Sequence, residues 1–226
     1  MNRKLSKDEI KKLPKFLKAM FKDESRFGGG VFKYKIGQVN IANIWNPDSE
    51  NSGGFNFSTE DQIARWIVRG DTLYDVVIPE DAEVILAENP STPNGVYRAN
   101  KIIVTNPREI TDELALELFL KSNLPEKTYY KTLAGYAVRG HINSCKEIIK
   151  QKVNKLNIDE VINEFEDFLT PKGEKFDSSK IEKKSVTAEI RKILYSIKES
   201  KNEDWKRKNA CGWNLWCKLW WRIIKR

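Results

Sequence analysis

The sequence is poor in the residues on which most metal sites and many catalytic sites depend: it has one histidine and three cysteines among 226 residues. A structural zinc site needs two pairs of ligands, and Cys211 and Cys217 have no second pair in the sequence. A Ser-His-Asp triad would have to use His141, which lies in a stretch with helical periodicity. We therefore expect no metal ligand and no catalytic residue, and an enzymatic role is disfavoured.

The chain also has little that would direct it out of the cytoplasm. No run approaches the roughly 18–20 apolar residues that cross a bilayer. The first residues, MNRKLSKDEIKKL, carry charges throughout where a signal peptide has an apolar core. The odd number of cysteines does not fit a disulfide framework and favours a reduced compartment. We expect a cytoplasmic protein.

Charged residues are unevenly distributed along the chain. There are 40 Lys and Arg against 32 Asp and Glu, a net charge of +8. Residues 1–22 and residues 201–226 each hold eight Lys or Arg and two acids, so each end carries +6 and the middle carries 8 − 12 = −4. A basic groove on the folded body is therefore disfavoured, whereas contact with nucleic acid through the basic ends stays open.

What the sequence does contain is enough apolar residues for a core, at 40% of the chain with 11% aromatic residues. Residues 1–26 predict an N-terminal amphipathic helix with a capping box of Ser6 and Glu9, which Pro14 would kink. Its apolar face recurs at helical spacing through Ile10, Leu13, Leu17, Met20 and Phe21.

Residues 27–109 predict a sheet domain with one embedded helix. Alternating residues indicate a strand over 31–36, and the polar stretch 39–53 is typical of a loop. Further strands are expected over 53–57, 73–79, 83–88 and 97–107, the last one stopped by Pro107.

The embedded helix follows the strand that presents Phe55 and Phe57 on one face. Ser58 is the expected N-cap of this helix, and Gly70 is its expected end. Its buried stripe would consist of Ile63, Trp66 and Ile67.

Helical periodicity dominates the rest of the chain. Residues 110–170 predict a helical region, and residues 171–226 predict a linker, a long helix and a basic Trp-rich tail. The expected helices cover 111–122, with Thr111 or Asp112 as the cap, 126–140, 142–155, 157–169 and 183–200. The predicted fold class is α+β: a small mixed β-sheet domain with one embedded helix, followed by a C-terminal α-helical bundle.

One helix pair resembles a known repeat. The stretch TLAGYAVRGHINSCKEII is similar to the helix–turn–helix core of an ankyrin repeat, through Thr132, Leu133, Ala137, Gly140, His141, Ile148 and Ile149. Only one copy is evident, and stacked repeats need neighbours, so the resemblance implies a single ankyrin-like hairpin in a helical bundle. It also implies local hydrogen bonds for His141 in the turn.

The sheet region resembles an uncharacterised family of phage and mobile-element proteins. The matching residues are Phe32, Tyr34, Gly37, Gly54, Phe55, Phe57 and Ser58. The resemblance covers most of the chain and implies no established activity.

The stretch GGFNFSTEDQIARWI is also similar to the middle motif of ADP-ribosyltransferases. This resemblance implies a nucleotide pocket at Tyr34, Phe57 and Ser58, with NAD as the cofactor. The sequence departs from the family where an Arg or His should stand, at Lys33 and Lys35, and where a Glu should stand, at Lys101. The departures favour a non-catalytic relative without a cofactor.

The tail has a composition typical of binding segments. Five of the seven tryptophans lie between residues 205 and 221, and basic residues lie among them. Such a helix suits a membrane interface, a protein groove or single-stranded bases, or it packs over the body. The candidate partner-binding residues are Trp213, Trp216, Lys218, Trp220, Trp221 and Arg222.

The sequence thus favours a non-enzymatic intracellular phage or mobile-element protein that binds a macromolecular partner and acts as an inhibitor of a host defence system. The expected partner is a protein or ribonucleoprotein. One alternative is an ADP-ribosyltransferase-like enzyme that uses NAD. A second is a peripheral membrane protein anchored by the Trp-rich tail.

Overall fold

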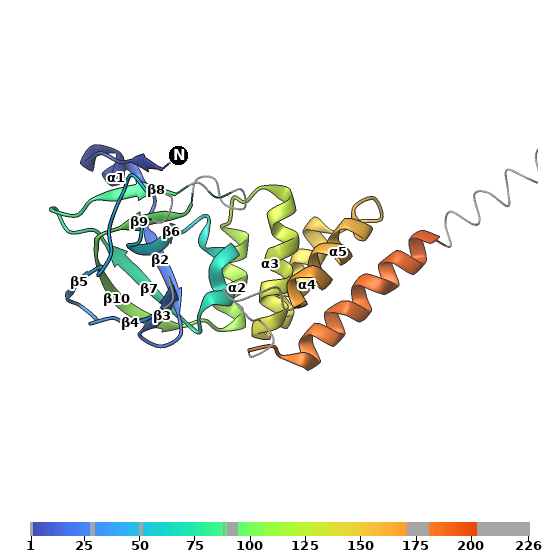
Figure 1. Cartoon of the computed structure of the whole chain (residues 1–226). Helices are drawn as coiled ribbons and strands as arrows, with labels where there is room; N and C mark the ends of the chain where they lie inside the picture. The colour runs from blue at the N-terminus through green and yellow to red at the C-terminus, as the bar shows by residue number, and fades with distance from the viewer. Residues whose placement is uncertain are drawn as a thin grey trace, which may run out of the picture.

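The structure, a computed structural model, describes residues 2–27, 30–49, 52–87, 89, 95–170 and 181–202. A β-rich body forms one end of the molecule, and layers of helices stack on one side of it (Figure 1). The outermost element is the helix that contains residues 184–202. The predicted α+β class, with the helices following the sheet, is confirmed.

The body is built on one eight-stranded sheet with the order β1-β8-β9-β6-β2-β7-β10-β5, and all of these strand pairs are antiparallel. A separate hairpin pairs β3 with β4. The strands of the large sheet are β1 Arg3–Lys4, β2 Phe16–Met20, β5 Val39–Ile41, β6 Phe55–Thr59, β7 Thr72–Val77, β8 Val84–Leu86, β9 Tyr97–Ala99 and β10 Lys101–Glu109, and those of the hairpin are β3 Glu24–Phe27 and β4 Gly30–Lys33.

The predicted N-terminal helix is only partly correct. Its capping box is present, but α1 spans Lys7–Lys12 and stops before Pro14. Residues 16–20, predicted as the second half of that helix, form β2 at the centre of the sheet. Because both faces of a central strand are buried, its apolar residues do not alternate with polar ones, and the apolar spacing mimicked a helix.

The sheet separates two cores. On one face the side chains are mainly aromatic, and α1 and the β3–β4 hairpin pack over them. On the other face Leu17 and Leu73 pack against the helical layer. The buried aromatic residues of the first core are Phe16, Tyr34, Phe55, Phe57, Tyr74 and Tyr97.

The embedded helix differs from its prediction at its start. β6 continues through Ser58 to Thr59, so Ser58 is a strand residue, and the predicted N-cap is wrong. The helix is the 3-10 helix η1, Ile63–Arg69, without a side-chain cap. Its predicted end is confirmed: Gly70 follows η1, and a Cβ there would lie 2.2 Å from the backbone nitrogen of Met20.

The last strand was predicted to stop at Pro107, and this is wrong. β10 reaches Glu109 because the register shifts between Thr105 and Arg108, which leaves the proline, without an N–H, at an irregularity of the ladder. Asn106 adopts the left-handed conformation there, with a φ of 51°. The predicted loop 39–53 also contains a strand, β5.

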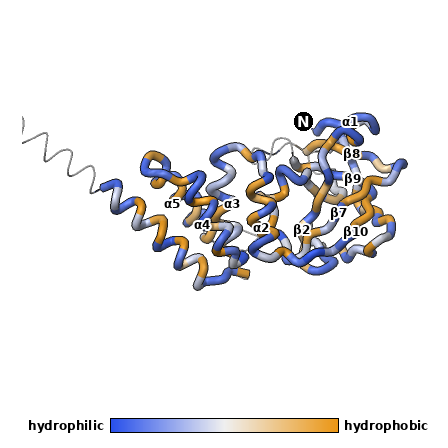
Figure 2. The backbone as a smooth tube through the Cα atoms, turned by 180° about the vertical axis from the view of Figure 1, so that it is seen from behind, coloured by the Kyte–Doolittle hydropathy of each residue, from blue (hydrophilic) through white to orange (hydrophobic). Residues whose placement is uncertain are grey.

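The helices predicted after residue 110 are confirmed in type and order. Thr111 caps α2 by accepting a hydrogen bond from the Leu114 amide at 3.3 Å, and Gly140 ends α3 with a φ of 90°. Figure 2 shows hydrophobic (orange) and hydrophilic (blue) stretches alternating along the helices, and hydrophobic stretches also in β7 and β10. None of the helices in the described ranges is long and apolar enough to cross a membrane. The helices are α2 Asp112–Leu120, α3 Glu126–Arg139, α4 Ile142–Lys152 and α5 Ile158–Leu169, besides residues 184–202.

Candidate functional site

The residues predicted to line a nucleotide pocket are core residues. Tyr34 is 3% exposed, and its ring packs on Phe32 and Phe55 with centroid distances of 4.9 and 5.3 Å. Its hydroxyl shares a 3.0 Å hydrogen bond with Ser25, and burial raises the pKa of Tyr34. The face of this ring is therefore already occupied by other side chains.

Phe57 and Ser58 lie on opposite faces of β6. Phe57, 4% exposed, packs on Phe16 with a centroid distance of 5.0 Å. Ser58, 1% exposed, donates its hydroxyl to the carbonyl of Gly95 on the helical side of the sheet. The structure thus brings Tyr34 and Phe57 into one aromatic core but does not bring Ser58 to them.

His141 lies beside a serine and an aspartate, but the three do not form a triad. The Ser144 hydroxyl donates to Asp112 Oδ1 at 2.6 Å, and His141 Nε2 has no hydrogen-bond partner. Burial lowers the pKa of His141 to about 4, so the imidazole is neutral at pH 7. The turn uses its backbone instead, since the His141 amide donates to the Tyr136 carbonyl at 3.0 Å. In the described part of the chain no cluster of three or more His, Cys, Asp and Glu side chains could hold a metal.

Lys18 is a chemically unusual group that the sequence did not single out. It lies in β2, is 7% exposed, and faces the aromatic core. Its ammonium donates to the Asn56 carbonyl at 2.5 Å and lies 5.4 Å from the centre of the Tyr34 ring. Burial lowers the pKa of Lys18 to about 8. A partly neutral amine is a potential nucleophile, but here core aromatic residues enclose it.

A shallow hollow of about 420 Å³ lies between the α2–α3 connection and the end of α4. Its buried tyrosine, Tyr129, is held by contacts within the protein. The Tyr129 hydroxyl donates to the Ser122 carbonyl at 3.0 Å and accepts from the Leu124 amide at 3.2 Å, while Lys152 lies over the Tyr129 ring at 4.4 Å. The rest of the lining is mainly polar and exposed, as at Glu126 and Asn154, and the hollow is wide open to solvent.

The feature that stands out is an apolar area on the face of the sheet that the helices only partly cover. The register places Val77 beside Ile103, and Ile103 beside Val39, so that one row crosses β7, β10 and β5. Ile41 lies two residues after Val39 in β5, on the same face of the sheet. Val39, Ile41 and Val77 are 47%, 60% and 50% exposed, and Ile103 is half-buried. We call these four residues the uncovered face.

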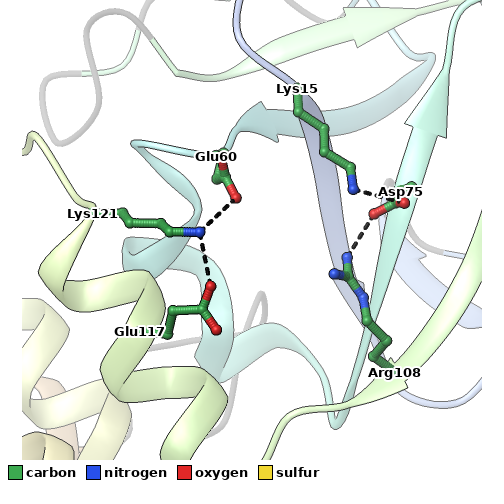
Figure 3. A network of polar contacts seen from close by, with 6 residues as sticks. All are labelled: Lys15, Glu60, Asp75, Arg108, Glu117 and Lys121. Carbon is green, nitrogen blue, oxygen red and sulfur yellow. Dashed lines mark hydrogen bonds and ion pairs between the residues drawn. The ribbon is translucent and has the colours of Figure 1, made fainter.

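Ion pairs lie next to the uncovered face, since Asp75 is two residues before Val77 in β7. Figure 3 shows the residues of these ion pairs. Asp75, 17% exposed, lies between Lys15 at 2.8 Å and Arg108 at 2.6 Å. Burial raises the pKa of this carboxyl, but hydrogen bonds from Lys15 and Asn106 outweigh burial, and the net pKa is lowered. These three charges are therefore held in one arrangement.

A second pair of contacts continues the border onto α2. Lys121 lies 2.8 Å from Glu117 on its own helix and 3.4 Å from Glu60, which follows β6 (Figure 3). The carboxylate of Glu117 and that of Glu60 raise the pKa of Lys121. The helical layer thus ends in a polar border, and the apolar row begins beyond it.

The uncovered face reaches an open edge of the sheet. β5 is the last strand in the order, and its outer side has no strand partner among the described residues. The opposite edge strand, β1, is two residues long and consists of exposed Arg3 and Lys4, which discourages pairing with another chain. The β5 edge has exposed valine and isoleucine instead.

The six tail residues predicted to bind a partner, from Trp213 to Arg222, lie outside the described residues. The four residues of the uncovered face were missed because they fall in separate segments, and only the pairing of the strands brings them together. The alternation of Val39, Asn40 and Ile41 was the one available signal of a strand there.

Comparisons with protein-family models, with curated proteins and with solved structures found no match for this chain.

Proposed function

We propose that this chain is a non-enzymatic binding protein that contacts a partner protein through the uncovered face. The observation that carries the proposal is the row of exposed aliphatic side chains formed by Val39, Ile103 and Val77, with Ile41 beside it. Single exposed apolar residues are ordinary on a protein surface, but a contiguous apolar area with a polar rim is typical of an interface.

The border of ion pairs supports this reading. Charges in a protein interface are concentrated at its rim, because a charge that loses its water without a partner is costly. Here Asp75 and Lys121 are paired within the chain before any partner arrives. A partner can therefore cover the apolar centre without stripping water from a lone charge.

The enclosed positions of Tyr34, Phe57 and Ser58 favour a binding protein over an enzyme that uses NAD. A nicotinamide ring stacked on Tyr34 would first have to displace Phe32 and Phe55. The rearrangement would expose several aromatic side chains. The burial of each one stabilises the fold by on the order of 2 kcal/mol, and this stabilisation would be lost. No such cost attaches to the uncovered face.

The test compares a double variant of the face with a matched control. Val39→Glu with Val77→Glu places two carboxylates in the apolar row, while the control Leu156→Glu places one carboxylate at an aliphatic residue that is 93% exposed in the helical part. Proteins captured from a bacterial lysate are quantified by mass spectrometry, and the best candidate is purified for titration calorimetry. We expect a partner that binds the wild type and the control equally and binds the double variant at least about tenfold more weakly.

Circular dichroism checks that all three proteins fold. If every captured protein binds the double variant as tightly as the wild type, the uncovered face is not the binding surface and the proposal fails.

A further inference from the structure

We propose that the open edge of β5 takes up an extended segment of the partner protein as an additional strand, and that this segment carries acidic residues next to its apolar ones. This inference rests on the proposed function and specifies the chemistry of the partner at the same surface. Adding a strand to an exposed sheet edge is one of the general modes of peptide recognition, in which main-chain hydrogen bonds supply much of the affinity.

The direction of the backbone groups follows from the printed register. The Ala42 amide donates to the Asn100 carbonyl at 2.8 Å, so Ala42 and Asn100 form a hydrogen-bonded pair of the β5–β10 ladder. Hydrogen-bonded and non-hydrogen-bonded pairs alternate along an antiparallel ladder, so Asn40 and Ile102 form the next hydrogen-bonded pair. The N–H and C=O groups of Val39 and Ile41 therefore point away from β10. They form a short row of unpaired donors and acceptors at the edge, among the residues that the structure describes.

The side chain of Asn40, the middle residue of β5, holds the strand against the residues that precede it. Asn40 is 4% exposed, and its side-chain amide accepts from the Lys35 amide at 2.8 Å and donates to the carbonyls of Lys35 and Gln38 at 3.1 and 3.0 Å. This clamp fixes the strand and leaves its outer edge free. An edge that is already extended loses little conformational entropy when a partner strand binds.

The side chains at the β5 edge are exposed aliphatic residues, unlike those of an edge protected against pairing. Natural sheets usually blunt their edges with charges, proline, bulges or short strands, because an open apolar edge pairs with other chains. β1 follows that rule with Arg3 and Lys4, whereas β5 presents Val39 and Ile41 at 47% and 60% exposure. The asymmetry between the two edges is what we expect if one of them is used for binding.

The charge around β5 identifies the kind of segment that fits. Residues 25–47 contain three Lys or Arg and no Asp or Glu, but Lys33 is already paired with Asp23 at 3.7 Å, so Lys35 is the cation relevant to β5. Lys35 is exposed and lies beside the centre of β5 through the backbone contacts of Asn40. An acidic residue in the incoming segment would meet Lys35, and apolar residues at alternate positions would meet the uncovered face.

The experiment uses a displayed library of random peptides about ten residues long, selected against the full chain. We expect enriched peptides with β-branched or aromatic residues at alternate positions and with Asp or Glu beside them. When a synthetic copy binds, hydrogen exchange at the Val39 and Ile41 amides should slow. A helical consensus, or unchanged exchange at both amides, would overturn the inference.

Three variants separate backbone, side chain and charge. Ile41→Pro removes an outward N–H without removing a bond to β10, and we expect it to weaken binding by at least about tenfold. Ile41→Ala keeps the N–H and should cost several-fold less. Lys35→Glu should shift the selected peptides from acidic to basic residues. Equal binding of the selected peptide to wild type and Ile41→Pro would contradict strand addition.

Two outcomes keep this inference distinct from the proposed function. A natural partner that is lost in the Val39→Glu and Val77→Glu variant but binds Ile41→Pro normally would uphold a binding face and refute strand addition. A wild-type chain that dimerises in sedimentation experiments, and does not do so as Ile41→Pro, would assign the edge to a second copy and also refute it.

Discussion

The ammonium group of Lys18 shows how a single buried charge sets a stability that changes with pH. Its aliphatic part fills space in the core that contains Tyr34, Tyr74 and Met20, and its charge has one carbonyl partner and one aromatic face. Removing an ammonium from water is costly unless it is fully paired. The pKa of Lys18, lowered from 10.5 to about 8 by burial, expresses that cost.

We predict that Lys18→Met stabilises the protein at pH 7 by on the order of 2 kcal/mol, because it removes the charge and keeps the volume. The folded pKa lies below the unfolded one, so the cost of the charge is fully present below pH 8. It declines between pH 8 and pH 10.5, where the folded state has already released the proton. Urea unfolding of both proteins from pH 7 to pH 9.5 should show the advantage of the variant shrinking as pH rises.

Burial also raises the pKa of Tyr34 and of Tyr74, and the carboxylates of Asp23 and Asp71 raise the pKa of Tyr74 further. Ionisation of these two tyrosines therefore opposes stability at high pH. Both tyrosines are present in each protein, so the difference between wild type and variant isolates Lys18. The exposed Lys192 supplies a control, since Lys192→Met should show no such trend. A variant that is less stable than wild type at pH 7 would refute the argument.

Among the elements, α2 and α4 are joined by one carboxylate. Asp112, in the first turn of α2, accepts from the Asn143 and Ser144 amides at 2.8 and 3.0 Å and so satisfies the start of α4, which has no side-chain cap of its own. Burial raises the pKa of Asp112, but the hydrogen bonds from Ser144 and Asn143 prevail and lower it overall. A residue that caps a neighbouring helix couples the ends of both.

We predict that Asp112→Asn destabilises the protein at pH 7 by about 1–2 kcal/mol, since an amide has one acceptor oxygen where the carboxylate has two. The folded pKa is lowered, so the contribution of the carboxylate is present above its unfolded pKa of about 3.9 and is lost as pH falls through the folded value. Thermal melts at several pH values should therefore show wild type and variant converging in acid. The solvent-exposed Asp159, which pairs with Lys198 and Lys201, is the control, and Asp159→Asn should change little.

The elements also show what the sequence could and could not predict. The helices from α2 to α5 carry strong periodicity and explicit ends, such as Thr111 and Gly140, and were predicted with their correct type and order. β2 was mistaken for a helix because both of its faces are buried in the assembled sheet. Ser58 has the residue type of a helix cap, but pairing with β2 extends β6 past it.

The candidate site was less accessible to sequence reasoning than the fold. Val39, Val77 and Ile103 lie in three segments, and their proximity depends on a strand order that no local pattern encodes. Their exposure likewise depends on how far the helical layer extends over the sheet and not on their own neighbours in the sequence. In the tail, by contrast, the unusual composition is contiguous in the sequence, and it predicted binding residues there.

At the scale of the whole molecule, a chain that ends at Asn202 distinguishes binding through the tail from binding through the uncovered face. The helix containing residues 184–202 already makes its core contacts through Ile190 and Leu194, and Arg191 pairs with Glu166 at 2.6 Å. We predict that the truncated chain folds, with a melting temperature within a few degrees of wild type.

If the uncovered face is the binding surface, this truncated chain should also keep the affinity of the full chain for the partner, measured by calorimetry. Val39→Glu with Val77→Glu in the full chain should lose it. The reverse pattern, loss on truncation and retention in the double variant, would return the binding role to the Trp-rich tail.

The position of β2 has a consequence for how the chain is made. β2 is synthesised early, yet Leu17 pairs with Ser58 on one side and with Asp75 on the other. On the ribosome the central strand must therefore wait, with its apolar side chains unpaired, until β6 and β7 have emerged. Such non-local pairing slows folding and prolongs the exposure of apolar segments. During synthesis, a segment in need of a chaperone is thus one that becomes a buried central strand of the finished sheet.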